Sequence, residues 1–381
     1  MSKFATVKTN NGINRSIAEL FRQMLEKQVI KAVLIPAKQP SSQMVMQTLI
    51  TNPNALDTID PFAPVSAVSS AKSAAALTNR SSGEPIAAVM RNCEIRAFIE
   101  LVKLHQGSTD DLIVIGTDCL GRYENREFLK LAGEQKELTT AFLAQAAGDK
   151  RYEKVVGAEI TTACKSCLYP IPKRADVNLC IVGAKPGEAI WLEAQSEKGE
   201  EALGALGLET TDEVPAGRQK AVDKLIADNS AFREKNLAAF AKKTENIDGL
   251  SAILSSCINC YNCRVACPVC YCRECVFVTD TFRHDGEQYL KWSEKRGKIK
   301  VPTDTVFYHL TRMIHMSTLC VGCGQCSSAC PNDIPLSELF ATVADRTQKR
   351  FEYLPGRDLQ EGQPLATFHT DEFNDVTGQV K

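Results

Sequence analysis

Two stretches decide how the second half of this chain folds: CINCYNCRVACP at residues 257–268 and CVGCGQCSSACP at residues 320–331. Each has four cysteines separated by two, two and three residues, and each ends in a proline. This spacing lets four thiolates wrap a [4Fe-4S] cubane. Zinc sites usually have two C-x2-C pairs separated by a longer gap, and plain buried thiols need no repeated spacing. The two complete copies therefore predict two [4Fe-4S] clusters.

Where two such runs share one domain, the fourth cysteine of each run binds the cluster of the other run. One predicted ligand set is therefore Cys257, Cys260, Cys263 and Cys330, and the other is Cys320, Cys323, Cys326 and Cys267. Pro268 and Pro331 end the two turns and help to direct the fourth ligands. Gly322 and Gly324 allow the backbone to approach a cluster closely.

Residues 268–319 separate the two motifs, and they include a helical stretch from Thr305 to Met316. With this insert and the sequence CVGCGQCSSACPNDIP, the region resembles the α-helical ferredoxin domain of succinate dehydrogenase iron-sulfur subunits and of small heterodisulfide reductase subunits. His309 and His315 lie in the insert, and we expect them to be packing or surface residues rather than ligands.

Three more cysteines, Cys270, Cys272 and Cys275, follow the first motif in CPVCYCRECVF. Three thiolates can hold a further cubane if a fourth ligand, such as Cys180, comes from elsewhere in the chain. The alternative is that they are structural thiols packed beside the ferredoxin clusters. No fourth ligand is visible in the local sequence.

The amino-terminal half alternates helical and strand-like patterns. Ile17, Leu20, Phe21, Met24 and Leu25 follow the stripe of an amphipathic helix, as does a second helix from residue 95 to residue 102. Short apolar runs predict strands at residues 30–35, 85–90, 112–115, 178–182 and 189–192. This alternation predicts an α/β domain with a largely parallel sheet.

Changes in composition divide the chain. We predict an α/β domain at residues 1–195 and a helical linker rich in Ala, Glu and Lys at residues 196–250. A mainly helical ferredoxin domain with two [4Fe-4S] clusters follows at residues 251–345, and an extended carboxy-terminal tail at residues 346–381.

Composition also excludes several classes of protein. The 381 residues carry 45 Lys and Arg against 46 Asp and Glu, so no basic excess indicates a nucleic-acid partner. No apolar run approaches the roughly 18 residues of a membrane span, and the first residues lack the apolar core of a signal peptide. We expect a cytoplasmic protein, where closely spaced thiols favour metal ligation over disulfides.

The amino-terminal half contains a second group of cysteines. Cys93 and Cys119 follow predicted strands, whose carboxyl ends converge on the ligand crevice of an open α/β sheet. Together with the C-x2-C pair Cys164 and Cys167 they can supply four thiolates to one cluster. Taken alone, Cys93 and Cys119 are equally compatible with inert buried thiols, and the pair with a zinc or dithiol site. Cys180 stands apart, inside a predicted strand.

Four stretches of this half give the chain a wider resemblance. They are NNGINRSIAELFRQMLEKQVIKAVLIP (10–36), PIAAVMRNCEIRAFIELVKL (85–104), LIVIGTDCLGRYENREF (112–128) and TTACKSCLYPIPKRADVNLCIVG (161–183). In their order and spacing they resemble the β subunit family of coenzyme F420-reducing hydrogenases and F420-dependent formate dehydrogenases. The resemblance implies FAD and one [4Fe-4S] cluster in this domain, the cluster on Cys93, Cys119, Cys164 and Cys167. The chain would then hold three clusters, or four with the additional cysteines.

The family usually has a serine and paired glycines before the first helix, where this chain has Asn11, Gly12, Ile13 and Asn14. A helix start with small polar residues still suits a diphosphate, because free amides and the helix dipole favour anions there. A simple N-cap formed by Asn14 is the alternative. The predicted FAD contacts are Gly12, Asn14, Arg15 and Ser16, with Ser66, Ser70, Lys72 and Arg91 as further candidates.

The resemblance implies the iron-sulfur flavoprotein β subunit of a formate dehydrogenase or hydrogenase complex. Its hydride partner would be coenzyme F420 or NAD(P), and its protein partners a catalytic subunit and a heterodisulfide reductase-like flavoprotein. One alternative is a pure electron-transfer subunit that meets no soluble hydride carrier. Another is a zinc-rich binding module. The sequence contains no G-x-G-x-x-G fingerprint that would identify the hydride carrier.

Overall fold

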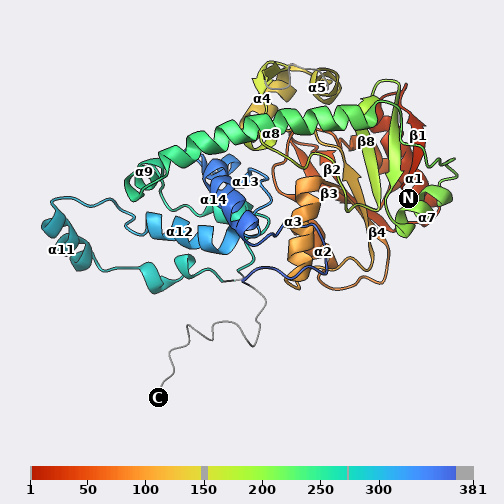
Figure 1. Ribbon diagram of the computed structural model, residues 1–381. Coiled ribbons are helices and arrows are strands. Elements are labelled where there is room, and N and C mark those ends of the chain that lie inside the picture. Colours follow the sequence, from red (N-terminus) through yellow and green to blue (C-terminus); the bar gives the residue numbers. More distant parts are fainter. Residues whose placement is uncertain (1, 147–152, 273, 366–381) are drawn as a thin grey trace.

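The computed structural model describes residues 2–146, 153–272 and 274–365. A sheet domain and a helical domain lie side by side, and the long helix α8 (Arg218–Lys243) runs along both of them (Figure 1). At one end α8 packs on strand β8 (Val177–Lys185), and along its length it contacts helix α14 (Leu336–Arg350). The predicted linker is therefore part of the packing of both domains.

The sheet has seven strands among the described residues, in the order β1-β9-β8-β5-β4-β2-β3. Only its centre, from β2 to β8, is parallel, while β1/β9, β8/β9 and β2/β3 pair in antiparallel fashion. The prediction of a largely parallel sheet is thus correct for the centre alone, because the short β2–β3 and β8–β9 connections form hairpins. The other strands are β1 (Lys3–Lys8), β2 (Ala32–Lys38), β3 (Val45–Ile50), β4 (Ile86–Arg91), β5 (Leu112–Thr117) and β9 (Ala189–Ala194).

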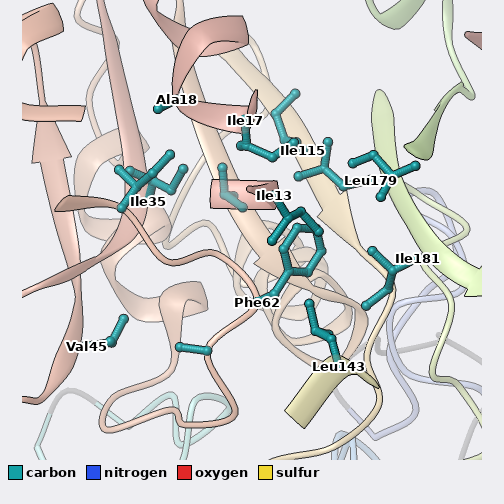
Figure 2. Packing of buried hydrophobic residues seen from close by; sticks show 14 of the residues in the cluster. Ile13, Ile17, Ala18, Ile35, Val45, Phe62, Ile115, Leu143, Leu179 and Ile181 are labelled. Carbon is teal, nitrogen blue, oxygen red and sulfur yellow. The ribbon is translucent and has the colours of Figure 1, made fainter. Parts of the chain in front are cut away.

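Both faces of the sheet are buried. In β4, Ala87 and Val89 face one core while Ala88 and Met90 face the other. Helix α1 (Ile13–Glu26) covers the first face and packs Ile17 near Ile35 and Ile115 (Figure 2). Helices α2 (Ser70–Thr78) and α3 (Asn92–Lys103) cover the second. The first core also includes residues of α4 (Asn125–Glu134) and α5 (Leu138–Ala146).

The strand order brings several loops to one edge. β1 is antiparallel to β9, and β9 to β8, so β1 points the same way as β8, β5 and β4. The loop after β1, the start of α3 after β4, and the loop after β5 therefore share the carboxyl edge of the sheet. This is the edge at which open α/β sheets bind ligands.

The described part of the ferredoxin domain consists of helices and loops. Helix α12 spans Thr305–Met316, the stretch for which the sequence predicts a helix. The short helices α10 (Asn262–Ala266) and α13 (Gln325–Ser328) each lie within one cysteine motif, and they contact one another. The remaining elements are α9 (Ile247–Ile253), η2 (Val276–Val278), η3 (Asp280–Phe282) and α11 (Gly286–Arg296).

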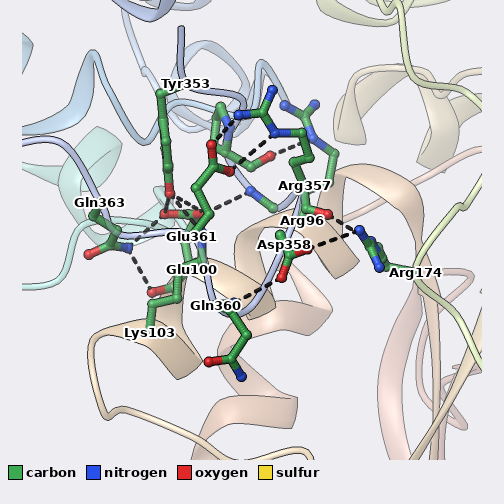
Figure 3. Close-up of polar contacts among 12 residues, drawn as sticks. Arg96, Glu100, Lys103, Arg174, Tyr353, Arg357, Asp358, Gln360, Glu361 and Gln363 are labelled. Atoms are coloured by element: carbon green, nitrogen blue, oxygen red, sulfur yellow. Dashed lines mark hydrogen bonds and ion pairs between the residues drawn. The ribbon is translucent and has the colours of Figure 1, made fainter. Parts of the chain in front are cut away.

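The region after the ferredoxin domain differs from the loose tail that the sequence predicts. Helix α14 continues to Arg350, past the predicted boundary at residue 345. The chain then returns to α3, where the buried carboxylate of Glu100 accepts hydrogen bonds from Tyr353 Oη (2.6 Å), Gly356 N (2.7 Å) and Gln363 Nε2 (2.6 Å) (Figure 3). We call residues 353–363 the return strap. The predicted tail beyond residue 365 lies outside the described residues.

Candidate metal and cofactor site

Four cysteines meet at the carboxyl edge of the sheet. Cys93 lies in the first turn of α3, Cys119 in the loop after β5, Cys164 in the short helix α6 (Thr162–Lys165), and Cys167 just beyond it. Burial raises the pKa of Cys119 to about 11, the Arg91 guanidinium opposes that rise, and the thiolates of Cys164 and Cys167 add to it. The structure therefore gathers the four residues that the family resemblance groups together.

Local geometry explains why these loops come so close. Gly121, two residues after Cys119, has a φ of +110°, and a Cβ atom there would lie 2.9 Å from Ile160 Cδ1 and 3.3 Å from Cys164 Cβ. Thr161 caps α6 by accepting a hydrogen bond from the Cys164 amide at 3.3 Å. Only glycine combines this backbone angle with such a close approach.

A half-buried arginine, Arg91, lies against this set. Arg91 donates from Nη2 to the carbonyl oxygens of Ala63 and Val65, each at 2.7 Å. Burial lowers the pKa of Arg91, but Glu94 and the thiolates of Cys119, Cys93 and Cys164 raise it by more. Its positive charge therefore faces the cysteines, and it stabilises thiolates over thiols.

The first ferredoxin-type set includes one cysteine from the second motif. Cys257, Cys260, Cys263 and Cys330 line one small cavity together with Tyr308 and His309. Burial raises the pKa values of Cys257 and Cys263, and the Cys330 thiolate raises both further. Cys330 thus lies where the predicted exchange of fourth ligands needs it.

The second set shows the reciprocal arrangement. Burial raises the pKa of Cys323 to about 12, and the thiolates of Cys267 and Cys320 contribute. Cys267 also raises the pKa values of Cys320 and Cys326, after burial. The last cysteine of the first motif therefore lies among the first three of the second.

Helix α12 provides polar side chains to the thiols, and two of them, Tyr308 and Arg312, were not predicted from the sequence. Arg312 donates from Nη1 to Cys263 Sγ at 3.1 Å, and Tyr308 Oη lies 3.5 Å from the same sulfur. His309 Nε2 lies 3.4 Å from Cys257 Sγ, so this histidine contacts a predicted ligand in addition to packing in the domain. Hydrogen bonds to sulfur tune the potential of a bound cluster.

Arg312 also lies between the two ferredoxin-type sets. Burial lowers the pKa of Arg312, but the thiolates of Cys263, Cys267 and Cys326 are among the groups that raise it, and the net shift is upward. Cys263 belongs to the first set, whereas Cys267 and Cys326 belong to the second. One buried cation therefore serves both sets.

The ferredoxin domain docks directly on the amino-terminal cysteine set. Gly324 has a φ of +76°, and a Cβ atom there would lie only 2.6 Å from Ala163 Cβ, next to Cys164. Gln325 donates to Ser66 Oγ at 2.8 Å, which places this predicted FAD contact at the domain interface. The Cys323 thiolate also raises the pKa of Cys93, after burial and Glu94.

Asn14 does not cap helix α1, so the alternative of a simple N-cap formed by Asn14 is wrong. Gly12 is the N-cap, with no side-chain cap and no acidic residue in the first turn. Gly12 has a φ of +99°, and a Cβ atom there would meet nothing within 4 Å. The side chain of Asn14 instead interacts with buried Asp60, and within the described part of the chain its Oδ1 is buried without a hydrogen-bond partner.

The remaining predicted FAD contacts are distributed more widely. Arg15 is exposed and Ser16 half-buried in the first turn of α1. Ser70 lies in α2, and its amide donates to Glu94 Oε1 at 3.1 Å. Lys72 donates to the carbonyl of Val265 at 2.6 Å, so the structure directs it to the ferredoxin domain and away from α1.

The four cysteines outside the three sets lie in two separate regions, one in the sheet and the other after α10. Cys180 is fully buried in β8, where its Sγ contacts Asn178 and Glu193. It therefore lies in the sheet, and not beside Cys270, Cys272 and Cys275 as a fourth ligand would. Those three follow α10, and Cys272 Sγ lies 3.9 Å from His315 Nδ1.

A cavity of about 640 Å³ lies beside the amino-terminal set. Asn92 and Tyr169, which neighbour Cys93 and Cys167 in sequence, are among its lining residues, as are Arg218 of α8 and Arg357 of the return strap. None of the predicted FAD contacts lines it. Sequence reasoning did not find this cavity, because its walls come from segments that are far apart in the chain.

Two features are absent from the described residues. No three His, Cys, Asp or Glu side chains there converge closely enough to hold a single metal ion. A cubane binds each thiolate to a different iron, so its four ligands surround a cube rather than a point. None of the described helices is both long and apolar enough to cross a membrane.

Comparison with known proteins agrees with this geometry. The family model of the 4Fe-4S dicluster domain matches residues 253–334. The β subunit of F420-dependent formate dehydrogenase from Methanocaldococcus jannaschii is 26% identical over 380 residues, which cover 92% of this chain and 95% of that protein. The β subunit of F420-dependent formate dehydrogenase 1 from Methanococcus maripaludis is 26% identical over 300 residues, covering 72% and 73%.

Among solved structures, the F420-reducing [NiFe] hydrogenase complex of Methanosarcina barkeri contains a chain that aligns with 65% of this one. The alignment covers 94% of that chain, with 15% sequence identity and a TM-score of 0.43. The matches to the two formate dehydrogenase subunits and to the dicluster domain confirm the resemblance that the sequence motifs predict.

Proposed function

We propose, from its likeness over most of its length to β subunits of F420-dependent formate dehydrogenases, that this protein is the iron-sulfur flavoprotein β subunit of a formate dehydrogenase or hydrogenase complex. Its partner would be the catalytic subunit of that complex, with a heterodisulfide reductase-like flavoprotein as a further electron partner. Coenzyme F420, which the names of the relatives contain, or NAD(P) would be the hydride carrier.

The observation that carries this proposal is the serial order of the three cysteine sets. Cys93 of the amino-terminal set interacts with Cys323 of the second ferredoxin-type set. Arg312 then joins that set to the first one, which contains Cys263. A continuous series of thiol sites thus leads from the carboxyl edge of the sheet into the ferredoxin domain.

The donor atoms fit the clusters that the family implies. Each set consists of four thiols, the usual ligands of [4Fe-4S] clusters. The proposed ligands are Cys93, Cys119, Cys164 and Cys167; Cys320, Cys323, Cys326 and Cys267; and Cys257, Cys260, Cys263 and Cys330. Two arginines balance the thiolates, half-buried Arg91 beside the first set and buried Arg312 between the other two.

The start of α1 fits the diphosphate of FAD. The first amides of a helix have no partner within it, and no carboxylate in the first turn of α1 opposes an anion. Gly12 leaves this end open, because a Cβ atom there would meet nothing within 4 Å. Gly12, Asn14, Arg15 and Ser16 would hold the diphosphate, while Ser66 and Arg91 lie toward the cysteines.

When bound, FAD would supply the exchange between hydride transfer and single-electron transfer. The role of this protein would be to hold FAD at the same edge of the sheet as the first cysteine set. Segment 60–66 links the two places, because Asp60 interacts with Asn14 while the carbonyls of Ala63 and Val65 accept hydrogen bonds from Arg91.

An anaerobic titration of the purified full chain tests the proposal. Reduced coenzyme F420, NADH and NADPH are added separately while the flavin absorbance is followed. We expect one of them to bleach the flavin rapidly, which identifies the hydride carrier. A flavin that dithionite reduces and none of the three carriers does would favour the alternative, a pure electron-transfer subunit. A preparation that holds zinc and no iron would contradict both.

A further inference from the structure

Helix α12 presents one stripe of polar side chains to the cysteines. Tyr308, Arg312 and His315 are spaced i, i+4 and i+7, so they lie on one face of the helix. The first two contact Cys263 Sγ, at 3.5 Å and 3.1 Å. The third places its Nδ1 3.9 Å from Cys272 Sγ. Each member of the stripe thus meets a thiol.

The thiol that His315 meets belongs to a group of three. The Cys270 amide donates a hydrogen bond to the carbonyl of Cys267 at 3.4 Å. Cys272 and Cys275 follow in the same loop. The group therefore borders the second ferredoxin-type set through Cys267.

An aromatic contact fixes this loop to the helix. The ring of Tyr271, between Cys270 and Cys272, lies 6.2 Å from the ring of His315 at an interplanar angle of 35°. The imidazole and the cysteine loop are thus held together by two contacts, one to each of two consecutive residues of the loop.

We propose that Cys270, Cys272, Cys275 and His315 bind a further iron-sulfur cluster, in which His315 is the ligand that the local sequence lacks. The inference rests on the proposed function, because it extends the series of clusters from Cys267 outward. Imidazole is an established ligand of iron in such clusters. It is neutral where a thiolate is negative, so we expect this cluster to accept an electron more readily than an all-thiolate one.

The position suits the outer end of an electron path. The His315 side chain is exposed, and the adjacent Ile314 is 68% exposed. Val276 and Val278, directly after Cys275, are 44% and 48% exposed. A cluster here would therefore lie at the surface.

The test uses the full chain, prepared anaerobically with ¹⁵N-labelled histidine. We expect iron and sulfide equivalent to four cubanes, and a directly bonded nitrogen in the pulsed electron paramagnetic resonance spectrum of the reduced protein. His315→Cys should keep the iron, lose the nitrogen coupling and lower the midpoint potential of that cluster. His315→Ala should lose one cubane's worth of iron. His284→Cys and His284→Ala are matched controls and should change nothing, because His284 contacts only aromatic rings among the described residues.

Several results would overturn the inference. One is iron for three cubanes with no nitrogen coupling, which leaves the proposed function intact. A second is one equivalent of zinc that disappears in His315→Ala, which would make this a Cys3His zinc site. A third is unchanged metal content and nitrogen coupling in both His315 variants. Iron for fewer than three cubanes would instead contradict the proposed function itself.

Discussion

Arg312 interacts with cysteines of both ferredoxin-type sets, so it would act on both of the clusters proposed there. It donates to Cys263 Sγ at 3.1 Å and to the Cys263 carbonyl at 3.1 Å, and its guanidinium lies 4.7 Å from the ring centroid of Phe340. The side chain is 5% exposed, so its charge is poorly screened by solvent. A fixed cation of this kind stabilises the more negative, reduced form of a nearby cluster.

Arg312→Gln should therefore lower the midpoint potential of the cluster on Cys263. A hydrogen bond to a charged group contributes about 1.5 kcal/mol, which for a one-electron couple corresponds to roughly 60 mV. Potentiometric titration followed by electron paramagnetic resonance measures the shift. Arg312→Lys keeps the charge and should shift less, and Arg346→Gln, at an exposed position of α14, should not shift it. Equal shifts in all three variants would show that the charge of Arg312 does not set the potential.

Asp60 gives a pH dependence to the amino-terminal domain. Burial raises the pKa of Asp60, and hydrogen bonds with Thr139 and Asn14 offset part of that rise. The folded protein thus holds this proton more tightly than the unfolded chain, whose carboxyl has a pKa of about 3.9. The stabilisation is fully present below that pH and is lost as the pH rises through the folded value.

Asp60→Asn should remove this loss, because a neutral amide carries no charge to bury. We compare the free energies of unfolding of the variant and of the native chain. Between pH 4 and pH 7, we expect their difference to shift in favour of the variant by about 1 kcal/mol for each unit of pKa shift. Urea unfolding at several pH values, compared with the exposed control Asp57→Asn, measures the difference. A difference that does not change with pH would mean that Asp60 is ionised throughout.

At the scale of elements, the second cysteine motif packs tightly against α6 of the sheet domain. A Cβ atom on Gly324 would lie 2.6 Å from Ala163, and the residue has a left-handed φ of +76°. Gly322 has a similar φ of +71° but nothing within 4 Å of its Cβ position. A side chain at either position would strain the backbone, but only a side chain at position 324 would also collide with a neighbour. Comparing the two substitutions therefore distinguishes backbone strain from steric contact.

Gly324→Ala should destabilise the protein and slow electron transfer between the amino-terminal set and the ferredoxin clusters, because α6 must move away. Gly322→Ala has only the backbone cost of about 1–2 kcal/mol, so we expect the thermal midpoint to fall but the transfer rate to hold. Stopped-flow reduction gives the rate. The double variant Gly324→Ala with Ala163→Gly should restore part of it, and failure to do so would place the effect elsewhere.

At the scale of the whole molecule, the return strap fastens the end of the ferredoxin domain to the sheet domain. The carboxylate of Glu100 is fully buried on α3 and also pairs with Lys103 at 3.2 Å. Its three strap partners lie more than 250 residues away in the chain. Arg96 adds a hydrogen bond to the carbonyl of Pro355 at 2.8 Å.

Glu100→Gln should release this strap, because it removes the buried charge and puts an amide donor among groups that themselves donate. A loss of about 3 kcal/mol is expected when one partner of a buried pair is removed. Hydrogen exchange followed by mass spectrometry should show faster exchange at residues 353–363, with the iron content retained. Glu134→Gln, at an exposed position of α4, is the control. Unchanged exchange in the strap would show that other contacts hold it.

Features that depend on local spacing could be predicted from the amino-acid sequence. The two cysteine motifs, helix α12 and the strands before Cys93 and Cys119 follow from periods of a few residues, and the structure has these helices and strands in place. The resemblance to formate dehydrogenase β subunits was also visible in local stretches. Such patterns can be recognised in a sequence because thiolate spacing and amphipathic periodicity are set within one turn or one strand.

Contacts between distant residues outside the two cysteine motifs followed only from the three-dimensional packing. It placed Arg312 between two cysteine sets, His315 beside Cys272, and Lys72 against Val265 instead of α1. It also made the sheet half antiparallel and turned the predicted loose tail into a strap on Glu100. These contacts depend on strand order and helix docking, which are fixed by burial summed over the whole chain and leave no signal in any one segment.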